Sequence, residues 1–334
     1  MKNQGFKLSV APMMDWTDRH CRYFHRLMSR RAVLYTEMVT ADAVIHGVRK
    51  RLLGFSPAEH PIVLQLGGSD PAKLAEAARI GADRGYDAIN LNCGCPSDRV
   101  QSGTFGACLM RDAAHVAGLV EAMKRATTIP VTVKCRVGVD DQDPHQVLPD
   151  FIAKVRDAGV DAVIVHARKA WLEGLSPKEN RDVPPLDYDL VLAMKREFPD
   201  LWMGINGGIA ALADAKTLLD QGMDEVMIGR AAYQTPADIL LHADEVLFGD
   251  TSSSQSRGDV VRAMLPYIEK HLVQGGRLNQ ITRHMIGLFA GQPGARQWRR
   301  ILSEGAHLDG AGPELVLQAL SAVEQRQTQK ATAA

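Results

Sequence analysis

Eight short runs rich in aliphatic and β-branched residues recur along the chain, and most are followed by a stretch with helical periodicity. The predicted strands cover 7–13, 33–38, 61–67, 88–93, 130–137, 162–168, 201–206 and 225–230. The predicted helices between them include 71–84, 112–126, 146–158, 187–197 and 210–221. Strands without polar alternation are typical of parallel sheets covered on both faces. We therefore predict an α/β fold, a closed TIM (β/α)8 barrel. A doubly wound open sheet is the alternative, but eight units in about 240 residues fit the barrel better.

The chain changes character after Phe248. A polar stretch at 249–257 predicts a linker. Helical patterns at about 258–273, 279–289, 294–304 and 313–325 follow, without a β-rich run. We predict a barrel domain over 1–248, a linker over 249–257, an all-helical domain over 258–325 and a disordered tail over 326–334.

The composition of this 334-residue chain, 46% hydrophobic and 23% charged, is that of an ordinary soluble protein. No apolar run approaches the ~20 residues of a membrane helix, and the N-terminus lacks the apolar core of a signal peptide. Five cysteines form no C-x-x-C pair and no zinc spacing, which predicts reduced thiols, a cytoplasmic location and no metal site. Zero net charge neither favours nor excludes a nucleic-acid partner. Without an oligomerisation signature, a monomer is the default expectation.

Polar residues end five consecutive predicted strands. They are Gln65, Asn92, Lys134, His166 and Asn206. Active sites of (β/α)8 barrels lie at this end of the strands. In the fifth strand, side-chain alternation places Lys134 inward together with Thr132 and Arg136. We therefore predict a polar active-site layer in the mouth of the barrel.

Glycines follow the last two strands, in Asn206-Gly207-Gly208 and Gly229-Arg230. These positions commonly bind phosphate through backbone N–H groups in such barrels. Together with an inward Lys134 they suit flavin mononucleotide (FMN), with the ammonium against the N1/C2 edge of the ring. A phosphorylated sugar or another small anion is the alternative ligand.

The fourth strand stops abruptly in Asn90-Leu-Asn-Cys-Gly-Cys-Pro-Ser97. Alternation predicts that Cys93 packs against the helical layer, whereas Cys95 belongs to the turn above the strand end. A thiol with a pKa near ~8.5 is mostly protonated at neutral pH and can act as an acid without special tuning. The turn thiol is therefore a candidate proton donor.

Six motifs distributed over the chain carry a family resemblance. They are A-P-M-M-D-W-T-D at 11–18, L-N-C-G-C-P at 91–96, V-K-C-R-V-G at 133–138, H-A-R-K at 166–169, N-G-G at 206–208 and I-G-R-A at 228–231. Together they resemble the tRNA-dihydrouridine synthase family, and L-N-x-G-C-P is the most specific of them. The segment 171–181 further resembles the A subfamily, whose targets are uridines 20 and 20a of the tRNA D-loop.

The resemblance implies reduction of the uracil C5=C6 bond by an FMN-dependent oxidoreductase. NADPH would reduce FMN, FMNH⁻ would deliver hydride to C6, and Cys95 would protonate C5 from the opposite face. The implied FMN-binding residues are Pro12, Met13, Met14, Gln65, Lys134, His166, Asn206, Gly207, Gly208, Gly229 and Arg230.

A tRNA substrate must swing its base out of the folded RNA, and basic residues would bind its phosphates. Residues 257–300 hold eight Lys/Arg and two acidic residues, so eight minus two gives a charge of +6 in a chain of zero net charge. Within this segment, Arg296 and Arg299 lie three apart on one helix face. Together with the resemblance to the A-subfamily signature, this predicts the tRNA-binding residues Lys178, Arg181, Arg296 and Arg299. Asn92 at the strand end and Arg99 in the loop after Cys95 are further candidates to bind the substrate. Arg181 is also a candidate to reach the target base.

Arg99 lies in the stretch 98–106, which contains Gly103 and Gly106. This loop is either a lid with glycine hinges or an inert connection.

Two other functions remain open. A small-molecule dihydropyrimidine or dihydroorotate oxidoreductase would share the flavin and the barrel, but it gives a basic helical domain no task. The other is a non-catalytic tRNA-binding or folding factor that keeps the flavin as a structural relic; the intact Cys95 and Lys134 favour an enzyme over this alternative.

Overall fold

A computed structural model describes residues 5–96, 105–250 and 255–332. Its internal contacts divide the chain into two compact units. The first comprises the residues up to Asp15, Val33–Ile209 and Ala213–Gly229. The second comprises Trp16–Ala32, Ala210–Leu212 and the residues from Arg230 onward.

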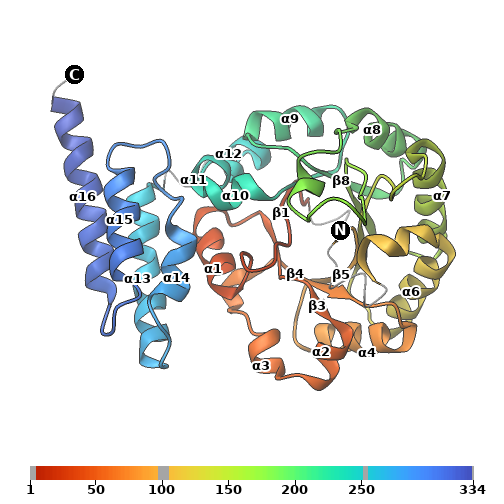
Figure 1. Ribbon diagram of the computed structural model, residues 1–334, viewed down its shortest axis with the longest axis horizontal. Helices are drawn as coiled ribbons and strands as arrows, with labels where there is room; N and C mark the ends of the chain where they lie inside the picture. The colour runs from red at the N-terminus through yellow and green to blue at the C-terminus, as the bar shows by residue number, and fades with distance from the viewer. Residues whose placement is uncertain (1–4, 97–104, 251–254, 333–334) are drawn as a thin grey trace. The chain divides into compact units, whose positions relative to one another are not determined.

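The first unit is a closed barrel of eight parallel strands, which confirms the predicted TIM barrel (Figure 1). Its strands are β1 (Leu8–Val10), β2 (Val33–Tyr35), β4 (Ile62–Gly67), β5 (Ala88–Cys93), β6 (Val131–Arg136), β7 (Ala162–His166), β8 (Trp202–Asn206) and β9 (Glu225–Ile228). The pairs β1–β9 and β2–β4 close the ring. The short β3 (Val39–Thr40), which was not predicted, extends the pairing at the end of β4. The open-sheet alternative is therefore wrong.

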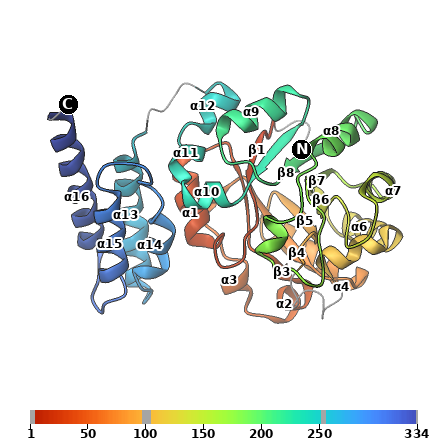
Figure 2. The same cartoon turned by 45° about the horizontal axis from the view of Figure 1, so that its top comes forward.

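Helices surround the strands on the outside of this unit (Figures 1 and 2). They are α2 (Ala41–His46), α3 (Arg49–Leu52), α4 (Pro71–Asp83), α6 (Ala113–Ala126), α7 (Pro144–Asp157), α8 (Tyr188–Glu197) and α9 (Leu212–Asp220). The 3-10 turns η1 (Pro57–Glu59), η2 (Gly106–Arg111) and η3 (Glu179–Arg181) lie in connecting segments. Four helices of this unit begin after an aspartate whose carboxylate accepts backbone N–H bonds, and their observed starts lie within two residues of the predicted ones. These caps are Asp70, Asp112, Asp143 and Asp187.

A Gly-x-Asp turn precedes three of the strands. Its glycine has positive φ, at +88° for Gly85, +86° for Gly159 and +104° for Gly222. A left-handed residue of this kind is the common way to end a helix, and glycine adopts it without a Cβ penalty. The turn therefore ends α4, α7 and α9 and leads directly into the next strand.

The aspartate of each turn binds the start of the preceding strand. Asp87 accepts the backbone N–H of Ile62 at 2.6 Å, and Asp161 accepts that of Val131 at 2.7 Å. Asp224 accepts the backbone N–H of Met203 at 2.8 Å. Each carboxylate also pairs with a side-chain cation or imidazole at 2.7 Å, from His60, Lys124 and Lys195 respectively. These contacts lie at the N-terminal end of the barrel, where residues serve stability and not catalysis.

Replacing Asp161 by Ala should destabilise the protein. The Val131 N–H and the Lys124 ammonium would lose their acceptor, and hydrogen bonds to charged groups contribute about 1.5–3 kcal/mol. Chemical unfolding followed by circular dichroism would measure the loss. Asp150→Ala is the control, because its exposed helical ion pair with Lys154 should contribute less than about 0.5 kcal/mol. Equal effects of the two variants would contradict the role of the Gly-x-Asp turn.

The second unit is helical. It contains α1 (Arg19–Met28), α10 (Arg230–Gln234), α11 (Pro236–Leu240), α12 (Ala243–Phe248), α13 (Arg257–Val273), α14 (Asn279–Met285), α15 (Ala295–Gly305) and α16 (Pro313–Thr332). The four predicted C-terminal helices are present, but α16 continues to Thr332, so the predicted disordered tail is wrong for 326–332. The predicted domain boundary at 248 places α1 and α10–α12 in the barrel domain. The internal contacts of the structure instead group these helices with the C-terminal helices.

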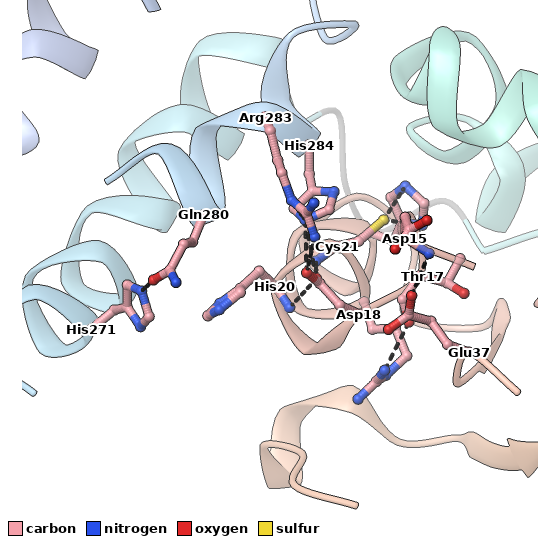
Figure 3. Close-up of polar contacts among 12 residues, drawn as sticks. Asp15, Thr17, Asp18, His20, Cys21, Glu37, His271, Gln280, Arg283 and His284 are labelled. Atoms are coloured by element: carbon pink, nitrogen blue, oxygen red, sulfur yellow. Dashed lines mark hydrogen bonds and ion pairs between the residues drawn. The ribbon is translucent and has the colours of Figure 1, made fainter. Parts of the chain in front are cut away.

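Asp18 explains why α1 belongs to this unit (Figure 3). Its carboxylate caps α1 by accepting the N–H groups of His20 at 2.9 Å and Cys21 at 3.0 Å. The same carboxylate contacts Arg283 at 2.6 Å and His284 at 3.1 Å, both on α14. Burial alone would raise the pKa of Asp18, but His284, the Cys21 N–H and Arg283 hold that pKa well below its usual range. In the part of the chain that the structure describes, no helix has the length and hydropathy needed to cross a membrane.

Candidate active site

The five polar residues predicted at the strand ends lie in one layer of the barrel. Four of them are buried, namely Gln65, Asn92, His166 and Asn206, and Lys134 is half-buried. Register places Asn92 opposite Lys134 and His166 opposite Asn206. Gln65 lies opposite Asn90, and it joins the layer through its side-chain hydrogen bond with Asn92. The structure therefore brings these five predicted site residues together.

A chain of hydrogen bonds between side chains links β4, β5 and β6. Gln65 Nε2 donates to Asn90 Oδ1 at 2.8 Å, and Asn90 Nδ2 donates to Thr132 Oγ1 at 2.8 Å. Asn92 Nδ2 donates to Gln65 Oε1 at 2.9 Å. Gln65 thus holds the amide of Asn92 in one orientation, in addition to its predicted role toward a cofactor.

Asn92 in turn fixes the backbone around Cys95. Its Oδ1 accepts the N–H groups of Gly94 and Cys95, each at 3.0 Å. Ala107 N donates to the Cys95 carbonyl at 2.9 Å, so the peptide groups on both sides of this residue are held. The Cys95 side chain is half-buried, whereas Cys93 is fully buried and its burial raises its pKa well above the usual range. Of these two cysteines, Cys95 is therefore the one whose thiol is partly accessible in the turn above the strand end.

Lys134 projects into the same layer. Its ammonium donates to Asn206 Oδ1 at 3.0 Å, and Asn206 Nδ2 donates to the Met227 carbonyl at 2.8 Å. Burial, reinforced by the neighbouring charge of Arg136, lowers the pKa of Lys134 to about 8. An anionic ligand would offset this cost, since an opposite charge favours the ammonium form.

His166 lies among cations. Burial lowers its pKa well below the usual value, and the charges of Arg136, Lys134, Arg168 and Arg181 lower it further. The imidazole is therefore neutral at physiological pH and can donate or accept one hydrogen bond at each nitrogen. The four surrounding cations make the mouth attractive to an anion.

The glycine turn after β8 packs closely against this imidazole. Gly207 and Gly208 have φ values of +118° and +69°. A Cβ on Gly207 would lie 2.7 Å from His166 Cδ2, and one on Gly208 would lie 2.6 Å from a methyl carbon of Leu186. Both glycines are thus required by conformation and by space. After β9, Gly229 lies near Met13: a Cβ added to Gly229 would be 3.6 Å from the Sδ atom of Met13.

The remaining predicted site residues fall into three groups. Pro12, Met13 and Met14 follow β1 in the barrel unit, and Met14 is exposed. Lys178 immediately precedes the η3 turn, Arg181 is its last residue, and both are exposed. Arg230, Arg296 and Arg299 belong to the helical unit, with Arg230 opening α10 and the other two exposed on α15. Arg99 and the predicted loop around it lie outside the described residues, apart from 105–106.

Two residues that the sequence analysis did not select contact the site segments. Arg136 was recognised as inward-facing, yet its bonds to the carbonyls of Gly94, Lys169 and Asn180 were not foreseen. Asn180 lies inside the A-subfamily segment, between the charged residues Glu179 and Arg181. Side-chain alternation along the strand indicated that Arg136 faces inward. The contacts of Asn180 depend on a loop conformation that no periodic pattern encodes.

A closed (β/α)8 barrel whose mouth gathers cations, amides, glycine turns and a turn thiol is typical of a TIM-barrel enzyme that binds an anionic ligand. Comparison with known proteins is consistent with this class. The model of the family described as dihydrouridine synthase (Dus) matches residues 9–326. The chain belongs to this family.

Curated relatives resemble the chain over nearly its full length. A protein of Shewanella oneidensis named tRNA-dihydrouridine(20/20a) synthase is 58% identical over 323 residues, covering 97% of this chain and 96% of that protein. Proteins with the same name from Escherichia coli (strain K12) and Vibrio vulnificus (strain CMCP6) are 59% and 54% identical. The alignments cover 95% of this chain and 91% of the first protein, and 96% of this chain and 97% of the second.

The shifted pKa of Lys134 predicts a pH dependence of stability for the cofactor-free protein. Between about 8 and the usual 10.5 the unfolded chain binds more protons at this residue than the folded one. The contribution of Lys134 to the free energy of unfolding should therefore rise with pH across this window, opposite in sign to that of the buried thiols Cys93 and Cys135, whose pKa values burial raises. Urea unfolding at several pH values would measure the slope of this free energy against pH, and Lys134→Met should make the slope less positive than that of the wild type. Lys216→Met, which removes an exposed lysine on α9, should leave the slope unchanged; equal slopes for all three proteins would refute the assignment.

Proposed function

We propose that this protein reduces uridine to 5,6-dihydrouridine in tRNA, at positions 20 and 20a of the D-loop. The observation that carries the proposal is the fixed Cys95 turn above a cationic, glycine-lined barrel mouth, in a chain of the dihydrouridine synthase family. The two positions follow from the names of the curated relatives. A monomer and a cytoplasmic location stay predictions.

The cofactor we propose is FMN, with NADPH as its electron donor. The residues fit such a group: Lys134 is a half-buried ammonium with a lowered pKa, and Arg136, Arg168 and Arg181 add positive charge around His166 in the same layer. Lys134, His166 and Asn206 would contact the ring or ribityl chain, and the glycine turns with Arg230 would bind the phosphate. When bound, a reduced flavin supplies the hydride for C6 of the uracil ring.

Cys95 would supply the proton for C5. Asn92 and Ala107 hold its backbone through three hydrogen bonds, so the thiol direction depends on the side-chain rotamer alone. Holding an acid in a fixed geometry removes the entropic cost of bringing it to the reacting carbon.

Arg296 and Arg299 are the proposed phosphate contacts of the helical unit. Both are exposed, and neither makes an ion pair among the residues described, whereas Arg257, Arg262 and Arg283 each pair with a carboxylate. Arg296 lies in the first turn of α15; this turn contains no acidic residue, and the helix has no side-chain N-cap. This positive end of the helix dipole disfavours cations and favours anions. A phosphate would therefore satisfy both the arginines and the free N–H groups.

Cys95→Ala should abolish dihydrouridine formation and leave tRNA binding intact, because it removes the proposed acid and no phosphate contact. Dihydrouridine would be measured by mass spectrometry of nuclease fragments, in tRNA that initially lacks the modification, with NADPH present. Cys108→Ala, which replaces another half-buried thiol, is the control and should retain activity. Full activity of Cys95→Ala would remove the proton-donor assignment, and an inactive wild-type protein with bound flavin would favour a free pyrimidine substrate.

Reversing charge at Arg296 and Arg299 together should weaken tRNA binding at fixed salt. Loss of two phosphate contacts should also reduce the slope of log affinity against log salt by roughly 1.4–1.8. Filter binding or fluorescence anisotropy over a salt series would measure both quantities. Reversal at Arg79 and Arg125, two exposed residues on barrel helices, matches the change in net charge. Identical slopes for the two double variants would show that α15 makes no specific phosphate contact.

A further inference from the structure

Asn180 is fully buried although Lys178, Glu179 and Arg181 around it are exposed. Its Nδ2 donates to the carbonyls of Trp171 at 2.8 Å and Leu175 at 3.1 Å, and lies 3.3 Å from that of Ser176. Its Oδ1 accepts the Trp171 N–H at 2.7 Å. One amide therefore connects the start, middle and end of the segment 169–181, which we call the substrate loop.

Arg136 connects the same loop to the Cys95 turn. This guanidinium is 3% exposed and lies at the end of β6. Its Nη1 donates to the carbonyls of Asn180 at 2.9 Å and Lys169 at 3.3 Å, so it joins the two ends of the loop. Its Nε donates to the Gly94 carbonyl at 3.1 Å, one residue before Cys95.

We propose that Asn180 and Arg136 are positioning residues that hold the substrate loop in register with the Cys95 turn. Asn180 presents Lys178 and Arg181 to the phosphates beside the extruded uridine, and Arg136 fixes that arrangement relative to the thiol. The inference rests on the proposed tRNA substrate, since it assigns the loop cations to that RNA.

The chemistry explains why these two residue types are used. A buried amide and a buried guanidinium carry enough fixed donors to satisfy several backbone carbonyls at once. The arrangement keeps the loop ordered before RNA arrives, so that binding does not have to order it. Lys at position 136 would offer a point charge without the fork that reaches Gly94 and Asn180 together.

Asn180→Ala tests the loop half of the proposal. We expect the KM for tRNA to rise roughly 10- to 100-fold with a much smaller change in kcat, since positioned contacts are lost and the acid is not. Flavin absorbance should stay near that of the wild type, whereas the melting temperature should fall by a few degrees, because buried carbonyls lose their donor. Asn279→Ala removes an exposed asparagine side chain outside the loop and should leave KM unchanged.

A double-mutant cycle separates positioning from general damage. In a Lys178→Ala/Arg181→Ala background, Asn180→Ala should add little to the rise in KM, because the groups it positions are already absent. A full additional rise in that background, or an unchanged KM in the single variant, would overturn the proposal. If Asn180→Ala does not fold, Asn180→Asp replaces it, as Asp keeps the acceptor for Trp171 N–H and removes the donors.

Arg136→Lys tests the connection to the thiol without requiring turnover. The rate of Cys95 alkylation by iodoacetamide, followed by mass spectrometry of its peptide, should change several-fold in Arg136→Lys and stay unchanged in Arg125→Lys. An unchanged rate in Arg136→Lys would remove Arg136 from the proposal. If the wild type forms no dihydrouridine, the proposed function fails; equilibrium tRNA affinity and alkylation would still decide whether the loop is held as described.

Discussion

Hydrogen-bond satisfaction inside a closed barrel is the constraint on which the site depends. Once the strands form a ring, inward amides near the strand ends are removed from bulk water, and each must find a partner. Gln65, Asn90 and Asn92 solve this by bonding to one another, with Thr132 at the end of the chain. The solution leaves Asn92 Oδ1 directed at the next turn, where it holds the backbone of Cys95. The interior packing of the barrel thereby sets the position of the proposed acid.

A second constraint is electrostatic. Lys134, Arg136, Arg168 and Arg181 all act on His166, and burial lowers the pKa of Lys134 to about 8 and that of Arg136 to about 10. Such a concentration of positive charge costs folding free energy, and an anionic ligand would offset the cost. The opposite end of the barrel shows the contrasting arrangement, in which each carboxylate of the Gly-x-Asp turns has its cation or imidazole beside it. Binding and stability are thus divided between the two ends of the barrel.

The helical unit is built around a comparable polar connection. Asp18 caps α1 and binds Arg283 and His284 of α14, so a segment from the first tenth of the chain folds with the last third. The aromatic rings of Tyr23 and Tyr267 stack at 4.1 Å and join α1 to α13 as well. These contacts explain why a domain boundary read along the chain differs from the grouping of its contacts.

The sequence by itself indicated the eight strands, the four C-terminal helices and the layer of polar strand ends, because these follow from local periodicity. The number of β/α units favoured a barrel over an open sheet, and the pairs β1–β9 and β2–β4 decided it. Side-chain alternation identified Lys134 as inward-facing, and the turn after β5 singled out Cys95. Tertiary structure alone decided the membership of α1 in the helical unit, the bonds of Arg136 and the burial of Asn180. The physical reason is that such contacts join residues far apart in the chain, or depend on an aperiodic loop. A pattern with a period of 2 or 3.6 residues carries no information about them.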